Sequence, residues 1–129
     1  MCLMAKSTIL IVEDDTVLRD LYLRKFSPEV YDVRMAGNGQ EALELIAKSR
    51  PDLVLLDINM PVLDGFGFLE KLPREQRSFP IVILTNFDDQ ANRDRGAKLG
   101  IDDYFVKKDM TIKSLVTMVE KLLENTVSH

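Results

Sequence analysis

The sequence contains few or none of the residues on which several classes of protein depend. Its 129 residues include one cysteine, one histidine and no tryptophan. The lone Cys2 cannot form an internal disulfide, which fits a reducing cytoplasm. There is no set of cysteines and histidines for a zinc site, and His129 at the last position leaves no histidine inside the fold. Disulfide-rich proteins, zinc proteins and Ser-His-Asp hydrolases are therefore excluded.

Long hydrophobic runs and glycine-rich loops are also missing. No apolar run approaches the about 20 residues that a membrane-spanning helix needs, and the first residues lack the apolar stretch of a signal peptide. No glycine-rich phosphate loop is present, which excludes a P-loop NTPase and a dinucleotide-binding protein. The chain carries 17 Lys and Arg against 21 Asp and Glu, for a net charge of −4. We therefore expect a soluble, cytoplasmic protein that has no membrane contact and no direct binding to nucleic acid.

Five short segments predict the strands of one sheet. Four of them, residues 8–12, 53–56, 81–84 and 104–106, are continuous apolar runs rich in β-branched or aromatic residues. Such runs are typical of parallel strands that are covered on both faces. Residues 30–36 alternate between polar and apolar side chains, which predicts an edge strand.

Helical patterns separate these strands. Four of them cover residues 16–26, 64–72, 88–99 and 112–123, the last as an apolar stripe. A further helix is expected to begin at the capping box formed by Asn38 and Glu41. The segment 88–99 is mostly polar and contains Gly96, so it is expected to be the least firmly held helix, with Gly100 as its left-handed cap. Strand and helix alternate five times, which predicts an α/β domain over residues 7–124, with short tails at 1–6 and 125–129.

The residues that end the strands carry the chemical information, because ligands of open parallel sheets bind at the carboxyl ends of the strands. In chain order, the first predicted strand is followed by Glu13-Asp14-Asp15, the third by Asp57, the fourth by Thr85 and the fifth by Lys107. Hard carboxylate oxygens suit Mg²⁺, and a lysine and a hydroxyl would complete a site for a phosphoryl group.

Each of these residues also has an ordinary structural interpretation. Carboxylates before a helix are commonly N-caps, which is the favoured interpretation for Asp15 and one of two open interpretations for the pair Glu13-Asp14. Asp57 or Lys107 alone would be a loop or surface residue, and Thr85 alone a routine β-branched residue. The functional interpretation depends on their joint occurrence at four strand ends.

With these motifs in place, the chain resembles a bacterial response-regulator receiver domain over residues 7–124. The matching segments are residues 9–15, the specific Asp-x-x-Met-Pro-x-x-Asp-Gly stretch at 57–65, residues 83–85 and residues 102–107. The resemblance implies a flavodoxin-like, three-layer fold with a five-stranded parallel sheet in the order 2-1-3-4-5. It also implies a signalling domain of a two-component system rather than an enzyme, catalysing only its own phosphotransfer and autodephosphorylation.

The resemblance assigns a phosphoacceptor and a metal site. Asp57 would accept a phosphoryl group from a phosphohistidine on a sensor histidine kinase or phosphotransfer protein. Asp14 would bind Mg²⁺ directly and Glu13 through water, while the backbone carbonyl of Asn59 would supply a further ligand. Phosphorylation would add charge and strong acceptor oxygens at Asp57.

The resemblance also assigns a switch. Thr85 would donate its hydroxyl to the phosphoryl group, Lys107 would contact one of its oxygens, and Tyr104 would turn inward. These changes would alter the face formed by the fourth helix, the fifth strand and the fifth helix, where a downstream effector or output domain binds. Contacts made only when phosphate is present supply the differential interaction that a two-state switch requires.

Two departures from the family pattern are visible. Lys108 follows Lys107 where the family generally has a proline in a cis peptide bond. A non-proline cis bond costs about 3 kcal/mol, which favours a trans bond and a reshaped loop. Asn86 and Phe87 follow Thr85 where a small residue is usual. Their bulk should narrow access to the phosphoryl group, so we expect slower phosphorylation by small donors and slower spontaneous hydrolysis of the aspartyl phosphate.

Two alternatives of other classes remain open at this stage. The altered loop after Lys107 suggests a receiver-like interaction scaffold that works without phosphorylation. An aspartyl-phosphate hydrolase of small molecules would share the nucleophile, but such enzymes usually have a second acid where this chain has Asn59. The retained acidic residues, with Thr85 and Lys107, favour the phosphorylated receiver.

Overall fold

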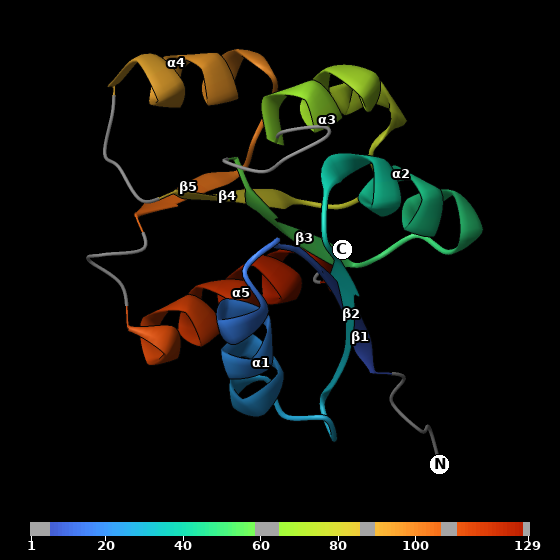
Figure 1. Cartoon of the computed structure of the whole chain (residues 1–129), viewed down its shortest axis with the longest axis vertical. Helices are drawn as coiled ribbons and strands as arrows, with labels where there is room; N and C mark the ends of the chain where they lie inside the picture. The colour runs from blue at the N-terminus through green and yellow to red at the C-terminus, as the bar shows by residue number, and fades with distance from the viewer. Residues whose placement is uncertain (1–5, 59–64, 86–89, 107–110, 128–129) are drawn as a thin grey trace.

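The computed structural model describes residues 6–58, 65–85, 90–106 and 111–127 (Figure 1). Parallel strands in these ranges form a five-stranded sheet in the order β2-β1-β3-β4-β5, which confirms the expected α/β fold. The strands are β1 (Ser7–Val12), β2 (Tyr31–Ala36), β3 (Leu53–Asp57), β4 (Ile81–Thr85) and β5 (Asp103–Val106). The helices are α1 (Thr16–Lys25), α2 (Gly39–Lys48), α3 (Gly65–Lys71), the 3-10 turn η1 (Arg74–Gln76), α4 (Gln90–Lys98) and α5 (Ile112–Val127).

The sheet lies between two layers of helices. Helices α2, α3 and α4 cover one face, and α1 and α5 cover the other (Figure 1). Because side chains alternate along a strand, each central strand contributes residues to both faces. Ile9 and Ile11 pack with Tyr22 of α1, whereas Leu10 and Val12 pack on the opposite side. This arrangement explains why β1, β3 and β4 are continuous apolar runs.

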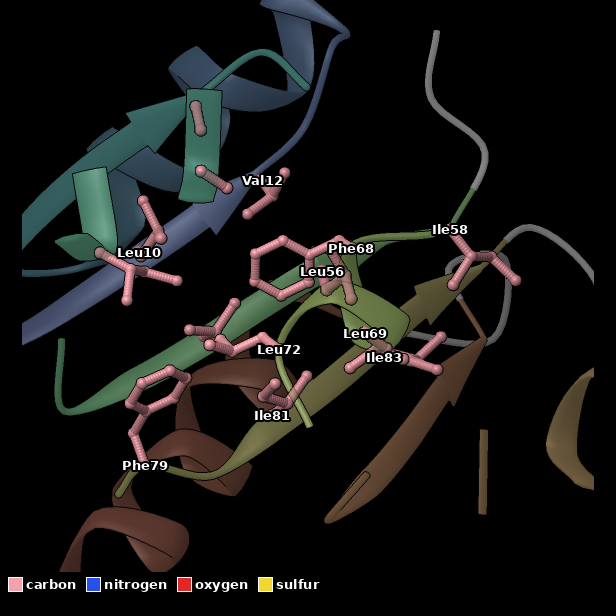
Figure 2. Close-up of a cluster of buried hydrophobic side chains, with 14 of the residues drawn as sticks. Leu10, Val12, Leu56, Ile58, Phe68, Leu69, Leu72, Phe79, Ile81 and Ile83 are labelled. Atoms are coloured by element: carbon pink, nitrogen blue, oxygen red, sulfur yellow. The ribbon is translucent and has the colours of Figure 1, made fainter. Parts of the chain in front are cut away.

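The core on the α3 face supports the strand ends. Figure 2 shows Phe68 and Leu69 of α3 turned toward strand residues that include Leu56 and Ile83. All four of these side chains are buried. Burying a side chain of this size stabilises the fold by about 1.5–3 kcal/mol, so α3 is firmly seated on β3 and β4.

Local signals in the sequence fix several element ends. The carboxylate of Asp15 accepts hydrogen bonds from the backbone N–H groups of Val17 (2.9 Å) and Leu18 (3.3 Å), as expected of an N-cap. Asn38 caps α2 in the same way, through the backbone N–H of Glu41 at 2.9 Å. Gly100 has a φ of 81°, which confirms the left-handed cap after α4.

The edges and the polar helix also agree with the sequence. Strand β2 lies at one edge of the sheet, as its alternation predicts, and it begins at Tyr31 rather than Val30. Helix α4 is described in full, and Gly96 is its one buried residue. Among the described residues, no helix has both the length and the apolar character to cross a membrane.

Candidate functional site

Three sequence-predicted residues gather where β1 and β3 end. Glu13 follows β1 directly, Asp14 comes next, and Asp57 is the last residue of β3. Each offers a carboxylate oxygen, and these oxygens all lie within 4.8 Å of one another. The register makes this possible, because Val12 lies beside Leu56, so that Glu13 and Asp57 follow at the same edge of the sheet. The expected acidic cluster is therefore present as an arrangement of side chains.

The cluster consists of three carboxylates, two of which are removed from water. Glu13 is 1% exposed and Asp57 is 3% exposed, whereas Asp14 is exposed. Carboxylates held this close repel one another, and burial adds the cost of desolvation. A small divalent cation that prefers oxygen ligands would relieve both effects. The donor set, three carboxylates with one open to solvent, fits Mg²⁺.

Backbone contacts orient the two neighbouring acids differently. The Glu13 carboxylate accepts a hydrogen bond from the backbone N–H of Asp15 at 3.4 Å, while the backbone N–H of Glu13 donates to the Ala36 carbonyl at 2.9 Å. Asp15, by contrast, points its carboxylate at the first turn of α1. Glu13 and Asp15, two positions apart, thus have separate roles, one in the cluster and one as the cap.

Gly65 brings α3 against the strand end that carries Asp57. Its backbone N–H donates to the Ile58 carbonyl at 3.3 Å. A Cβ atom on residue 65 would lie 2.7 Å from the Ile58 Cα and 2.9 Å from the Asp57 carbonyl oxygen. Side chains essentially never approach backbone this closely, so glycine is required for this packing. Sequence reasoning used Gly65 as part of a motif and missed this role.

A buried tyrosine lies close enough to the cluster to be affected by its charge. Tyr22 of α1 is 1% exposed and packs against the sheet in the core that α1 and α5 cover. Burial raises the pKa of its hydroxyl well above the usual value, and the negative charges of Glu13, Asp57 and Asp15 raise it further. The sequence pattern assigned Tyr22 only to the apolar face of its helix.

The two predicted switch residues lie on the same face of the sheet. Thr85 ends β4 and is fully buried, and Tyr104 of β5 is half-buried. Tyr104 pairs with Ile83, and residues two apart on a strand share a face, so Thr85 and Tyr104 both face the layer of α3 and α4. The guanidinium carbon of Arg93 lies 4.5 Å from the centroid of the Tyr104 ring. Sequence reasoning did not identify Arg93.

Several expectations fall on residues outside the described ranges. Asn59 and Lys107, and the departures at Asn86, Phe87 and Lys108, belong to segments 59–64, 86–89 and 107–110. Val106, beside Thr85 in the register, is the last described residue before Lys107.

A doubly wound parallel sheet with an acidic cluster at its carboxyl edge defines the class of protein, and comparison with known families gives the family itself. The model of the response regulator receiver domain family matches residues 9–120. The chain therefore belongs to this family of two-component signalling domains. Its sheet order and helix placement agree with that membership.

Similar proteins agree with this assignment. The response regulator MprA of Mycolicibacterium vanbaalenii is 39% identical over 118 residues, which cover 92% of this chain and 51% of MprA. The probable transcriptional regulator ycf27 of Porphyridium aerugineum is 37% identical over 128 residues, covering 95% and 53%. The BeF3-activated N-terminal receiver domain of Klebsiella pneumoniae RstA is 34% identical, with a TM-score of 0.82 over 91% of this chain and 98% of that domain. The chain spans about half the length of the curated relatives it matches.

Proposed function

We propose that this domain, spanning residues 7–124, is a phosphorylation-switched receiver in which Asp57 is the phosphoacceptor. The observation that carries the proposal is the convergence of Glu13, Asp14 and Asp57 within 4.8 Å, in a chain of the receiver family. A carboxylate oxygen of Asp57 attacks the phosphorus of a phosphohistidine. The new P–O bond forms as the P–N bond breaks, and the bonding pair stays on the imidazole nitrogen. The donor is a sensor histidine kinase or a phosphotransfer protein.

The same carboxylates would hold Mg²⁺ as the cofactor. Asp14 and Asp57 would bind it directly, Glu13 through a water molecule, and Asn59 through its backbone carbonyl. Bound there, Mg²⁺ supplies charge neutralisation for the phosphoryl oxygens. The protein's own contribution is to hold the carboxylates in place, through the Asp15 N–H on Glu13 and the packing of Gly65 behind Asp57.

The output is a change on the face formed by α4, β5 and α5. Thr85 donates its hydroxyl to the phosphoryl group and Lys107 contacts a phosphoryl oxygen. Tyr104 then turns inward, which releases the contact with Arg93 on α4. The partner is a downstream effector or an output domain. Attack of water on the phosphorus returns the Asp57 carboxylate and inorganic phosphate, and this autodephosphorylation resets the switch.

Phosphotransfer from a small donor with a P–N bond tests the proposal. The protein is incubated with phosphoramidate and Mg²⁺, and its intact mass is measured before and after treatment with hydroxylamine, which cleaves acyl phosphates. We expect one phosphoryl group that hydroxylamine removes, and none on Asp57→Asn. Asp15→Asn is the matched control, because it removes a neighbouring carboxylate and keeps a capping side chain. Phosphorylation of Asp57→Asn at the level of the natural protein, or a phosphoryl group on the natural protein that hydroxylamine does not remove, contradicts the proposal.

A further inference from the structure

Arg77 joins the carboxyl ends of two helices. It lies in the segment between η1 and β4, and it donates hydrogen bonds through all three nitrogens of its guanidinium group. Nε donates to the Leu72 carbonyl at 3.0 Å, Nη1 to the Gly100 carbonyl at 3.2 Å, and Nη2 to the Leu99 carbonyl. Among the described residues, three backbone carbonyl oxygens thus accept hydrogen bonds from this guanidinium group.

These three carbonyls belong to helix ends. Leu72 follows the last residue of α3, and Leu99 and Gly100 follow the last residue of α4. The final carbonyls of a helix have no partner within the helix and form the negative end of its dipole. A guanidinium group, which is planar and always charged, can satisfy several of them at once. Arg77 therefore ties the carboxyl end of α4 to that of α3.

Other contacts hold the same half of α4. Arg95 pairs with Glu70 of α3 at 3.3 Å, and its guanidinium carbon lies 4.3 Å from the centroid of the Phe66 ring. Gly96 approaches the sheet so closely that a Cβ atom there would lie 3.1 Å from Cδ1 of Ile83 on β4, and 2.9 Å from Cδ1 of Ile101. The carboxyl-terminal half is thus joined to α3 and to the sheet.

The amino-terminal half of α4 is placed differently. Gln90, Ala91 and Asp94 are exposed, and this half reaches the sheet layer through Arg93 on the Tyr104 ring. The hydrogen bond from Gln90 to Asp94 at 2.9 Å lies within the helix. The carboxyl-terminal half is thus joined to α3 and β4, whereas the amino-terminal half contacts the ring of a predicted switch residue.

We propose that Arg77 is a positioning residue that makes the carboxyl end of α4 a fixed pivot. A change at Thr85 and Tyr104 then moves the amino end of α4, while the end near Gly100 stays with α3. The role of the pivot in signalling rests on the proposed switch. The hydrogen bonds of Arg77 that fix the carboxyl end of α4 are present in the resting protein. It directs the response of the domain to the amino end of α4.

Amide hydrogen exchange of the full chain in its resting form tests the mechanical part. The informative amides are those of Leu99, Gly100 and Ile101, which donate to carbonyls in the last turns of α4. In Arg77→Gln we expect these amides to exchange about tenfold faster, as loss of charge-assisted hydrogen bonds implies, with β-strand amides unchanged. Arg50→Gln is the matched control, because Arg50 is exposed and contacts Ser78 and Phe79 instead.

A purely structural role gives a different pattern. If Arg77→Gln accelerates exchange equally over α4 and the central strands, or leaves the three amides unchanged, the pivot is overturned. Should Arg77→Gln fail to fold, Arg77→Lys gives the same reading, since it keeps the charge and loses the planar fork.

A second arm follows the response to Mg²⁺ with beryllofluoride, which mimics a phosphoryl group. In the natural protein we expect amide shifts of α4 to concentrate at residues 90–93, and in Arg77→Gln to extend to residues 99–101. Equal shifts at both ends of α4 in the natural protein, or the same pattern in the variant, overturn the pivot. If no amide of the natural protein responds, the proposed function fails, and the exchange result alone decides the claim about Arg77.

Discussion

The guanidinium carbon of Arg93 lies 4.5 Å from the centroid of the Tyr104 ring, which links the amino-terminal half of α4 to the edge strand β5. A cation over an aromatic face stabilises by about 0.5–1 kcal/mol where it is exposed and about 2 where it is desolvated. Tyr104 shares a sheet face with Thr85. In the proposed switch the ring would turn inward and give up the contact with Arg93, so we expect this contact to favour the resting state.

A double-mutant cycle measures this interaction. Arg93→Ala, Tyr104→Ala and the double variant are unfolded in urea, and their free energies of unfolding are compared. We expect a coupling energy of about 0.5–1 kcal/mol between the two positions. Strictly additive losses would show that the ring and the guanidinium group do not stabilise each other.

Gly65 offers a prediction about packing beside Asp57, the proposed phosphoacceptor. Gly65→Ala places a methyl group 2.9 Å from the Asp57 carbonyl oxygen, so α3 must shift and the strand end with it. We expect a loss of about 1–3 kcal/mol in the free energy of unfolding, together with weaker Mg²⁺ binding. The control is Gly37→Ala, whose Cβ would meet Glu41 Oε2 at 3.5 Å and Arg19 Nη1 at 3.6 Å, both ordinary contacts. Equal losses for the two alanines would contradict the close-approach argument.

The acidic cluster predicts opposite effects of removing two neighbouring carboxylates. In the metal-free protein, Asp57→Asn relieves repulsion and should raise the free energy of unfolding by about 1 kcal/mol. Asp15→Ala removes the cap of α1 and should lower it by about 1 kcal/mol. Mg²⁺ at ten times its dissociation constant should stabilise the natural protein and Asp15→Ala by about 1.4 kcal/mol, and Asp57→Asn little. Equal stabilisation of Asp57→Asn by Mg²⁺ would remove Asp57 from the metal site.

Tyr22 predicts how stability depends on alkaline pH. Burial and the nearby carboxylates raise the pKa of its hydroxyl in the folded protein, whereas the unfolded chain releases this proton near pH 10, at about the ordinary value. The folded state therefore holds a proton that the unfolded state loses, and stability falls as pH rises above about 10. Tyr22→Phe should make this fall shallower, by up to about 1.4 kcal/mol per pH unit. Urea unfolding at several pH values measures it, and identical slopes would contradict the assignment.

The sequence predicts the fold because the signals for it are local. The runs ending at Val12 and Leu56 are apolar without alternation, which only strands covered on both faces require. Asp15 and Asn38 predict where their helices begin, because their side chains cap the first turns. The acidic cluster is equally accessible, since the topology alone brings the ends of neighbouring parallel strands together.

The remaining features depend on contacts between distant segments, which no local pattern encodes. Arg77 reads as a polar loop residue, and its hydrogen bonds to Leu99 and Gly100 join segments more than twenty positions apart. Arg93 reads as one more charge in a polar helix, although its position over Tyr104 gives it a partner on β5. The steric need for glycine at position 65 becomes visible only with the backbone of Asp57 and Ile58 beside it.

Amide NMR titration with Mg²⁺ and then beryllofluoride tests the central claim most directly, with Asp57→Asn as the control. Beryllofluoride attaches to the acceptor carboxylate, so it avoids the restriction on donors that Asn86 and Phe87 are expected to impose. The account predicts shifts at Asp14 and Asp57 that spread to Thr85, Tyr104 and α4, and that vanish in the control. Metal shifts without a response to beryllofluoride, or a full response in Asp57→Asn, would contradict it.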